Sequence, residues 1–183
     1  MIVIAVGNVF RGDDGAGPEL AARVRALHLP RVAVVEAPGD VGLMDAWTGH
    51  ASVILLDAVH SGAVPGTVIR RDVVAAPLPR DWFRLSSHQL GVADAVELAR
   101  TMGTLPSKVV FIGIEGARFD SGVGLSPAVE AAIGEAAALV RSEAQPVRPR
   151  RRAARRRRSL ARVRQTRARA PGSPPRWKSA GGS

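Results

Sequence analysis

The sequence predicts an α/β fold in which helices cover both faces of a sheet. Short apolar runs alternate along the chain with segments whose apolar residues recur every three or four positions. Continuous apolar runs of this kind are typical of strands buried on both faces. Hydrophobic residues make up 46% of the 183 residues, which is enough for a packed core. The absence of cysteine excludes disulfides, thiolate metal sites and a cysteine nucleophile.

Five segments are predicted to be strands because each is a short, mostly apolar run bounded by turn signals. In order, they are Ile2–Val6, Val32–Val35, Ser52–Leu56, Gly66–Arg71 and Lys108–Gly113. The first ends at Gly7-Asn8, a turn signal. The fourth follows the Pro65-Gly66 turn and is predicted to be an antiparallel strand at an edge.

Helices are predicted between the strands and after the last one. Pro18 opens the first, which extends to about Leu29, because proline is favoured in a first helical turn. A short helix is expected near Val41–Trp47. Ser86 and Gln89 form a capping box for a helix from about His88 to Met102. Ser126-Pro127 begins the last helix.

The formal charge of +10 is concentrated near the end of the sequence. Residues 145–183 hold 14 of the 26 Lys and Arg and none of the 16 Asp and Glu, so residues 1–144 carry 12 basic and 16 acidic groups, a net charge of −4. We therefore predict a folded domain over 1–144 and a basic Arg/Pro/Gly-rich tail over 145–183. The composition of the tail favours disorder. A solvated extension is the favoured interpretation of the tail, and nucleic acid is not an expected partner except through it.

No apolar stretch approaches the roughly 20 residues needed to cross a bilayer. The apolar run at Met1–Gly7 lacks a positively charged flank and is too short for a secretory signal. We therefore expect a cytoplasmic protein with no membrane partner, and a monomer because the domain is small.

The segment Gly7–Gly17 is a glycine-rich loop after the first strand. Such loops often bind dinucleotides, but this one carries Asp13 and Asp14 where the phosphates would lie. Two carboxylates repel a pyrophosphate and attract a cation. The loop therefore favours cation binding over nucleotide binding.

Asp14, Asp57 and His88 form a candidate metal site. Asp14 follows the first strand and Asp57 the third, and ligands of parallel sheets lie beyond the carboxyl ends of the strands. His88 lies at the predicted start of a helix, where the helix dipole keeps the imidazole neutral and able to bind a metal. Two carboxylates and an imidazole suit nickel or zinc, and three protein ligands leave positions open for catalysis.

Each of these residues also has a simpler interpretation. Asp57 taken alone is better explained as a turn or capping residue. A single histidine is usually structural, and we interpret His28, His50 and His60 in that way. His60 is the least clear of the three because it closely follows Asp57.

Three motifs together resemble the maturation endopeptidases of nickel-iron hydrogenases. They are Gly7-Asn8-x-x-x-Gly12-Asp13-Asp14-Gly15-x-Gly17, Asp57-Ala58 and Ser87-His88-Gln89-Leu90-Gly91, and the resemblance covers about residues 1–142. It implies a three-layer α/β/α sandwich with a twisted, mostly parallel sheet of about five strands. It also implies an enzyme, classed as an aspartic-type peptidase, that removes the C-terminal extension of the hydrogenase large-subunit precursor once nickel is inserted.

By motif position, the resemblance makes Asp14, Asp57 and His88 the metal-contacting and catalytic residues, and Asp13 a neighbour that orients the loop. Nickel would arrive with the substrate, so no permanently bound cofactor is expected. Two alternatives remain open from the sequence: a non-enzymatic chaperone that checks for nickel, and a nucleic-acid-binding protein that acts through the basic tail.

Overall fold

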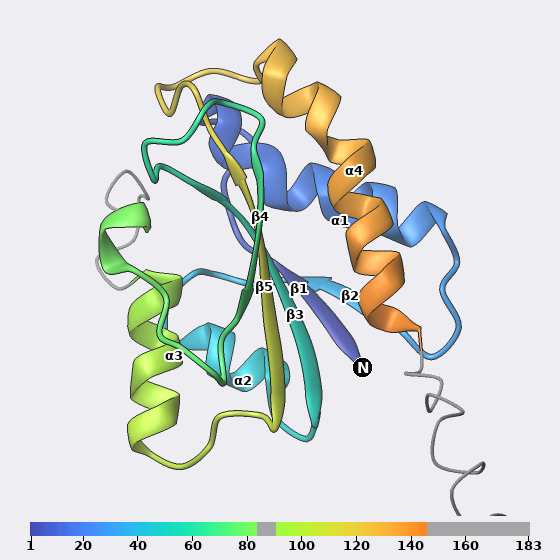
Figure 1. The fold of residues 1–183 in the computed structure, drawn as a ribbon, viewed down its shortest axis with the longest axis vertical. Helices are drawn as coiled ribbons and strands as arrows, with labels where there is room; N and C mark the ends of the chain where they lie inside the picture. The colour runs from blue at the N-terminus through green and yellow to red at the C-terminus, as the bar shows by residue number, and fades with distance from the viewer. Residues whose placement is uncertain (84–90, 146–183) are drawn as a thin grey trace, which may run out of the picture. The chain divides into compact units, whose positions relative to one another are not determined.

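The computed structural model describes residues 1–83 and 91–145, and it contains one five-stranded sheet. The spatial order is β2-β1-β3-β5-β4. Four strands are parallel and β4 runs antiparallel to β5 at one edge, as predicted (Figure 1). The strand bounds are β1 Ile2–Ala5, β2 Ala33–Glu36, β3 Ser52–Val59, β4 Val68–Asp72 and β5 Lys108–Glu115.

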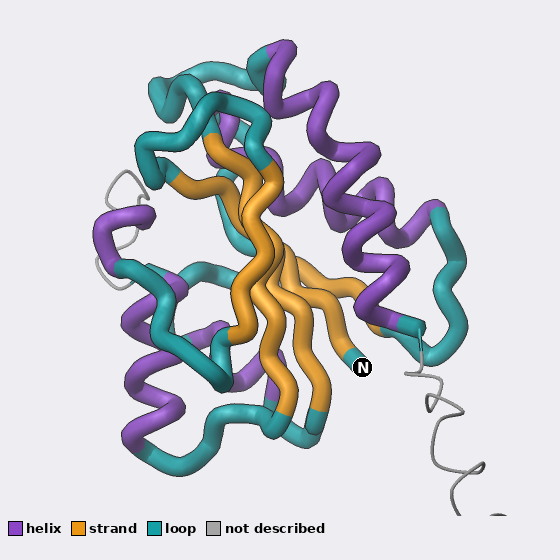
Figure 2. Tube along the Cα trace, viewed as in Figure 1, coloured by secondary structure: helices purple, strands orange, loops and turns teal. Residues whose placement is uncertain are grey.

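Helices cover both faces of the sheet, which confirms the three-layer arrangement (Figure 2). The helices α1 (Ala16–Ala26) and α4 (Pro127–Ala144) pack on one face, and α2 (Gly42–Trp47) and α3 (Val92–Thr101) pack on the other. Two short 3₁₀ helices, η1 (Gly12–Gly15) and η2 (Arg80–Phe83), were not predicted. The central strands β1, β3 and β5 are almost wholly buried because helices shield them from both sides.

Two helices begin at other residues than predicted. Helix α1 begins at Ala16, directly after η1, so Pro18 lies inside its first turn, where a missing N–H costs no hydrogen bond. Helix α3 begins at Val92, with the extended residue Gly91 as its N-cap. The Gly91 N–H donates to Asp94 Oδ2 at 3.3 Å. The predicted capping box at Ser86 and Gln89 and the predicted start at His88 lie outside the described residues.

The strands β3 and β5 are longer than predicted, and this changes the position of Asp57. Asp57 lies within β3, opposite Gly113 of β5, rather than after the end of the strand. The neighbouring strand β1 ends at Ala5, which pairs with Leu56. Asp57 is therefore the first residue of β3 beyond the end of β1.

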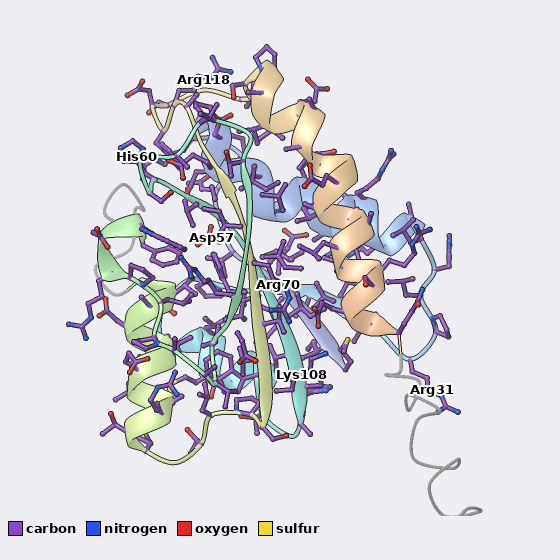
Figure 3. All side chains as sticks on the ribbon, in the orientation of Figure 1. Arg31, Asp57, His60, Arg70, Lys108 and Arg118 are labelled. Carbon is purple, nitrogen blue, oxygen red and sulfur yellow. The ribbon has the colours of Figure 1, made fainter. Side chains whose placement is uncertain are left out.

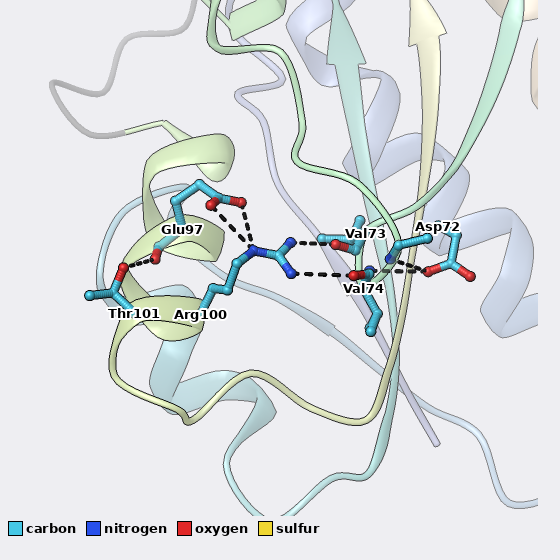
Figure 4. A network of polar contacts seen from close by, with 7 residues as sticks. Asp72, Val73, Val74, Glu97, Arg100 and Thr101 are labelled. Atoms are coloured by element: carbon cyan, nitrogen blue, oxygen red, sulfur yellow. Dashed lines mark hydrogen bonds and ion pairs between the residues drawn. The ribbon is translucent and has the colours of Figure 1, made fainter.

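Arg100 connects α3 to the segment that follows β4 (Figure 4). Its guanidinium group donates to the carbonyl oxygens of Val73 and Val74 and pairs with Glu97 one turn earlier in α3. These contacts hold α3 against the segment that follows β4. Within the described residues, no helix is long and apolar enough to cross a membrane. The predicted tail lies outside these residues from position 146 onward, so its properties stay predictions.

Candidate active site

The loop after β1 folds back on itself through glycines that no other residue can replace without strain. Gly7 has a φ of +131°, and a Cβ there would lie 2.0 Å from the carbonyl oxygen of Asp14. The next residue, Asn8, donates its N–H to that same oxygen at 3.1 Å. A Cβ on Gly17 would lie 2.0 Å from the carbonyl oxygen of Val6. These two glycines therefore permit close backbone packing at the end of β1, which explains them without a bound nucleotide.

Asp13 is fully buried in η1 and accepts four hydrogen bonds from the loop between β5 and α4. The N–H groups of Ala117 and Arg118 donate to Oδ2 at 2.7 and 3.1 Å. Ser126 donates its N–H to Oδ1 at 2.6 Å and its hydroxyl to Oδ2 at 2.9 Å. Burial by itself raises the pKa of Asp13, but these hydrogen bonds outweigh it and lower the pKa below its ordinary value. Asp13 is an ionised residue that fixes η1, as the resemblance implied.

Ser126 has a different role from the one expected of it. It is the N-cap residue of α4, but its side chain makes no capping hydrogen bond, because the hydroxyl points to Asp13 instead. The β5–α4 loop is thereby tied to η1 at the start of the last helix. No local sequence pattern links positions 13 and 126, so this pairing was missed.

Asp14 and Asp57 come together at the carboxyl edge of the sheet, each only 5% exposed. Burial raises the pKa of Asp57 well above its ordinary value, and the nearby charge of Asp14 raises it further. The Ala58 N–H, which donates to Asp57 Oδ1 at 2.8 Å, opposes this shift only in part. Figure 3 shows Asp57 inside the molecule near the upper part of the sheet. The structure thus brings together two of the three predicted site residues.

An acid pair of this kind is chemically suited to a cation. Two buried carboxylates destabilise each other when both are ionised, so one retains its proton at a higher pH than usual. A divalent cation reverses this balance because it favours both charged forms. Carboxylate oxygens of this type are ligands for nickel and zinc when a nitrogen ligand is added.

The third predicted residue, His88, lies outside the described residues. The described residues on either side of segment 84–90 are Phe83 and Gly91, and a Cβ on Gly91 would lie 3.3 Å from Phe83 Cβ. Next to Phe83, the carbonyl oxygen of Trp82 accepts a hydrogen bond from the N–H of His60, directly after β3. Within residues 1–83 and 91–145, no group of three or more His, Asp or Glu side chains is arranged to hold a metal ion.

Glu115 is a buried carboxylate that the sequence analysis did not single out. It ends β5, and its two oxygens accept the N–H groups of Ser61 and Gly62 and the hydroxyl of Ser61, at 2.6 to 3.0 Å. Glu115 therefore holds the loop that follows β3, next to Asp57. An acidic residue at the end of an apolar strand was the only signal for it, the same signal that singled out Asp57.

The remaining histidines make other contacts or lie in other segments. The ring of His60 packs edge-on against Phe119, with 6.1 Å between the ring centroids. His28 is exposed, and its Nδ1 lies 2.9 Å from the carbonyl oxygen of Ala26. His50 is partly buried in the turn between α2 and β3.

Comparisons with known proteins agree with this arrangement. A family model described as hydrogenase maturation protease (HycI) matches residues 22–143, two thirds of the chain. Asp57 and His88 fall within that range, and Asp14 precedes it. The Hydrogenase 2 maturation protease of Escherichia coli (strain K12) is 29% identical over 139 residues, which cover 73% of this chain and 83% of the relative.

Two further relatives extend the comparison. The hydrogenase expression/formation protein HupD of Rhodobacter capsulatus is 30% identical over 140 residues, 70% of this chain, but the match covers only 63% of that relative's length. Among solved structures, the hydrogenase maturating endopeptidase HybD from E. coli is similar with a TM-score of 0.63 and 29% identity, over 76% of this chain and 88% of that one.

The fold and the acid pair define an α/β protein with a cation-suited site at the carboxyl edge of its parallel strands. The chain belongs to the hydrogenase maturation protease family, whose members are peptidases that process the hydrogenase large subunit.

Proposed function

We propose that this chain removes the C-terminal extension of a nickel-loaded hydrogenase large-subunit precursor, and that Asp14, Asp57 and His88 contact the nickel. Family membership supports the class of reaction. In this proposal the nickel belongs to the substrate and serves as the recognition element, so the enzyme needs no resident cofactor. The domain 1–144 carries the activity as a monomer, and the tail 145–183 is not required.

The observation that carries the proposal is the burial of Asp14 beside Asp57. Without a cation, burial and the charge of Asp14 keep the pKa of Asp57 high. A divalent cation carried by the precursor would favour the ionised form of both carboxyl groups and so offset this shift. The acid pair therefore distinguishes a precursor that carries nickel from one that does not, because only the first relieves the repulsion between the two charges.

The position of His88 along the chain is compatible with a third contact. The segment 84–90 begins after Phe83 and ends before Gly91, and these two residues lie against each other next to the end of β3. Asp57 belongs to the same strand. A neutral imidazole supplies the nitrogen ligand that would complete the set of two oxygens and one nitrogen.

The reaction is metal-assisted hydrolysis of one peptide bond. A nickel ion carried by the substrate would polarise the scissile carbonyl and would lower the pKa of a water bound to it from about 16 towards about 7. An oxygen of Asp14 or Asp57 that does not bind the ion takes the proton from this water. The hydroxide adds to the carbonyl carbon, the C–N bond breaks, and the proton passes to the departing amine.

The test is Asp14→Asn, which preserves the size of the side chain and removes its charge. We expect the variant to lose processing of a nickel-loaded precursor, followed by mass spectrometry of the large subunit. Asp45→Asn is a matched control, because Asp45 is exposed in helix α2. An Asp14→Asn variant that trims the precursor at the parental rate would contradict the assignment of Asp14.

His88→Ala tests the third residue in the same assay. We expect loss of processing, because the change removes the proposed nitrogen ligand, and a thermal melt of the variant separates lost chemistry from lost fold. Cleavage itself separates this function from a chaperone that only checks for nickel. If the parental chain binds the loaded precursor and never shortens it, the peptidase mechanism is wrong for this chain.

A further inference from the structure

Two loops at the carboxyl edge of the sheet expose apolar side chains beside the acid pair. Val9 and Phe10, in the loop after β1, are 47% and 67% exposed, and Val123, in the β5–α4 loop, is 72% exposed. We call these three residues, together with Arg11 and Arg118 next to them, the Phe10 rim. Single exposed apolar residues are common. The Phe10 rim differs because its residues are held together by backbone contacts at the edge of the site.

The backbone of the Phe10 rim is fixed by hydrogen bonds between its two loops. The Gly122 N–H donates to the carbonyl oxygen of Phe10, and the Gly12 N–H donates to that of Gly122, both at 2.8 Å. The Phe10 N–H also donates to Asn8 Oδ1 at 2.9 Å. Phe10 is therefore presented to solvent on an ordered turn, and an ordered anchor loses little conformational entropy when a partner binds.

The same turn is joined to Asp14. Asn8 donates its N–H to the carbonyl oxygen of Asp14 at 3.1 Å, and the Asp14 N–H donates to that of Arg11 at 3.2 Å. Phe10 is thus at the tip of a turn whose base is a residue of the proposed active site. A folded substrate that brings a metal ion to Asp14 must lie against this turn.

The Phe10 rim also carries positive charge. Arg11 donates to the carbonyl oxygen of Phe119 at 3.2 Å, and Arg118 donates to that of Gly124 at 3.1 Å. In the described part of the chain, neither guanidinium group pairs with a carboxylate. Figure 3 places Arg118 near the carboxyl ends of the parallel strands and Lys108 at their opposite ends. The N–H donors of these two guanidinium groups that are not used within the described residues suit a partner with acidic side chains.

A cavity of about 440 Å³ adjoins the Phe10 rim. Val9 and Asn8 line it together with Glu36, Ala37 and Pro38 from the end of β2 and beyond. A protruding aromatic residue next to a hollow offers a partner both an anchor and a place for an apolar side chain of its own. Aromatic and arginine residues in such positions commonly dominate the affinity of an interface.

We propose that the Phe10 rim is the docking surface for the protein substrate, and that it binds a surface segment of the precursor in which an apolar side chain is flanked by carboxylates. This inference rests on the proposed function, because its partner is the precursor that the acid pair processes. Docking through the Phe10 rim adds affinity that does not depend on the nickel. The Phe10 rim therefore acts on binding of the protein surface, whereas Asp14 and Asp57 act on recognition of the nickel and on the chemical step.

The test is steady-state processing of the nickel-loaded precursor by Phe10→Ala. We expect KM to rise about 10- to 100-fold, the range for truncation of an aromatic anchor, with kcat within about twofold of the parent. Met102→Ala is the matched control, because Met102 is 60% exposed at the C-terminal end of α3, towards the other edge of the sheet. Val123→Ala is an independent variant on the second loop and should raise KM by a smaller factor.

A charge variant tests the second part of the inference. Arg118→Gln should raise KM and reduce its dependence on ionic strength, whereas Arg31→Gln, at an exposed arginine far from Arg118 in Figure 3, should change neither. Equal KM values for Phe10→Ala and Met102→Ala would overturn the docking surface and leave the proposed function intact. Failure of the parental chain to process the loaded precursor would overturn both.

Discussion

Replacement of Asp13 by Asn should destabilise the fold strongly, although the two side chains have the same shape. The Asp13 carboxylate accepts three hydrogen bonds on Oδ2 and one on Oδ1. An asparagine that keeps its oxygen at the Oδ2 position turns its NH₂ group towards the N–H of Ser126, so two donors face each other. The opposite orientation loses the other three bonds instead.

The expected loss follows from these bonds. A hydrogen bond to a charged group contributes about 1.5–3 kcal/mol and a neutral one about 0.5–1.5, so the three retained bonds together weaken by about 3 kcal/mol. The buried N–H of Ser126 loses its acceptor, at a cost of about 1–3 kcal/mol. Relief of the cost of burying a charge offsets part of this sum. The net decrease in the free energy of unfolding is expected to be about 2–4 kcal/mol.

Urea unfolding of the parent and of Asp13→Asn measures this difference. Because hydrogen bonds lower the pKa of Asp13, its stabilising contribution is complete above the unfolded-state pKa of about 4 and is lost as the pH falls below that value. The two unfolding free energies should therefore converge in acid. The exposed Asp120→Asn should stay within about 0.5 kcal/mol of the parent. If Asp13→Asn does so too at pH 7, the carboxylate does not hold the two loops together.

Three other predictions concern the site, two glycines in helices and the tail. Asp57→Asn should raise the free energy of unfolding of the metal-free protein above about pH 4. Burial and Asp14 raise the pKa of Asp57, so its ionised form is penalised in the folded state. A pH series of urea unfolding that shows no gain in this free energy would contradict the prediction. Gly17→Ala should lower the free energy of unfolding by more than about 3 kcal/mol, because the added Cβ would meet the carbonyl oxygen of Val6. In Gly134→Ala on helix α4 the added Cβ meets nothing within 4 Å, so this variant should raise the free energy of unfolding by about 0.5–1 kcal/mol. Thermal melts of both variants compare the two effects. A chain that ends at Gln145 should keep the parental melting temperature and processing rate. A loss of processing would mean that the tail is required for the activity.

The strands and most helices were predictable because their signals are local. Runs such as Ile2–Ala5 and Lys108–Glu115 are buried on both faces, and this burial is written in the continuous apolar sequence itself. The antiparallel edge position of β4 followed from the turn at Pro65-Gly66. The end of β3 was predicted too early, because an aspartate after four apolar residues normally ends a strand. Pairing with β5 continues the ladder to Val59.

The sequence by itself determined the residue types of the site and their order along the chain. It also indicated that Asp14 and Asp57 lie near the carboxyl ends of parallel strands, although Asp57 proved to lie within β3 and not after it. Only the tertiary structure decided in which direction the pKa of each acid is shifted. The pKa of Asp13 is lowered by four donors from a loop more than 100 positions away. The pKa of Asp57 is raised by burial and by the charge of Asp14. A carboxyl group takes its pKa from its neighbours in space, and local sequence patterns describe only neighbours along the chain.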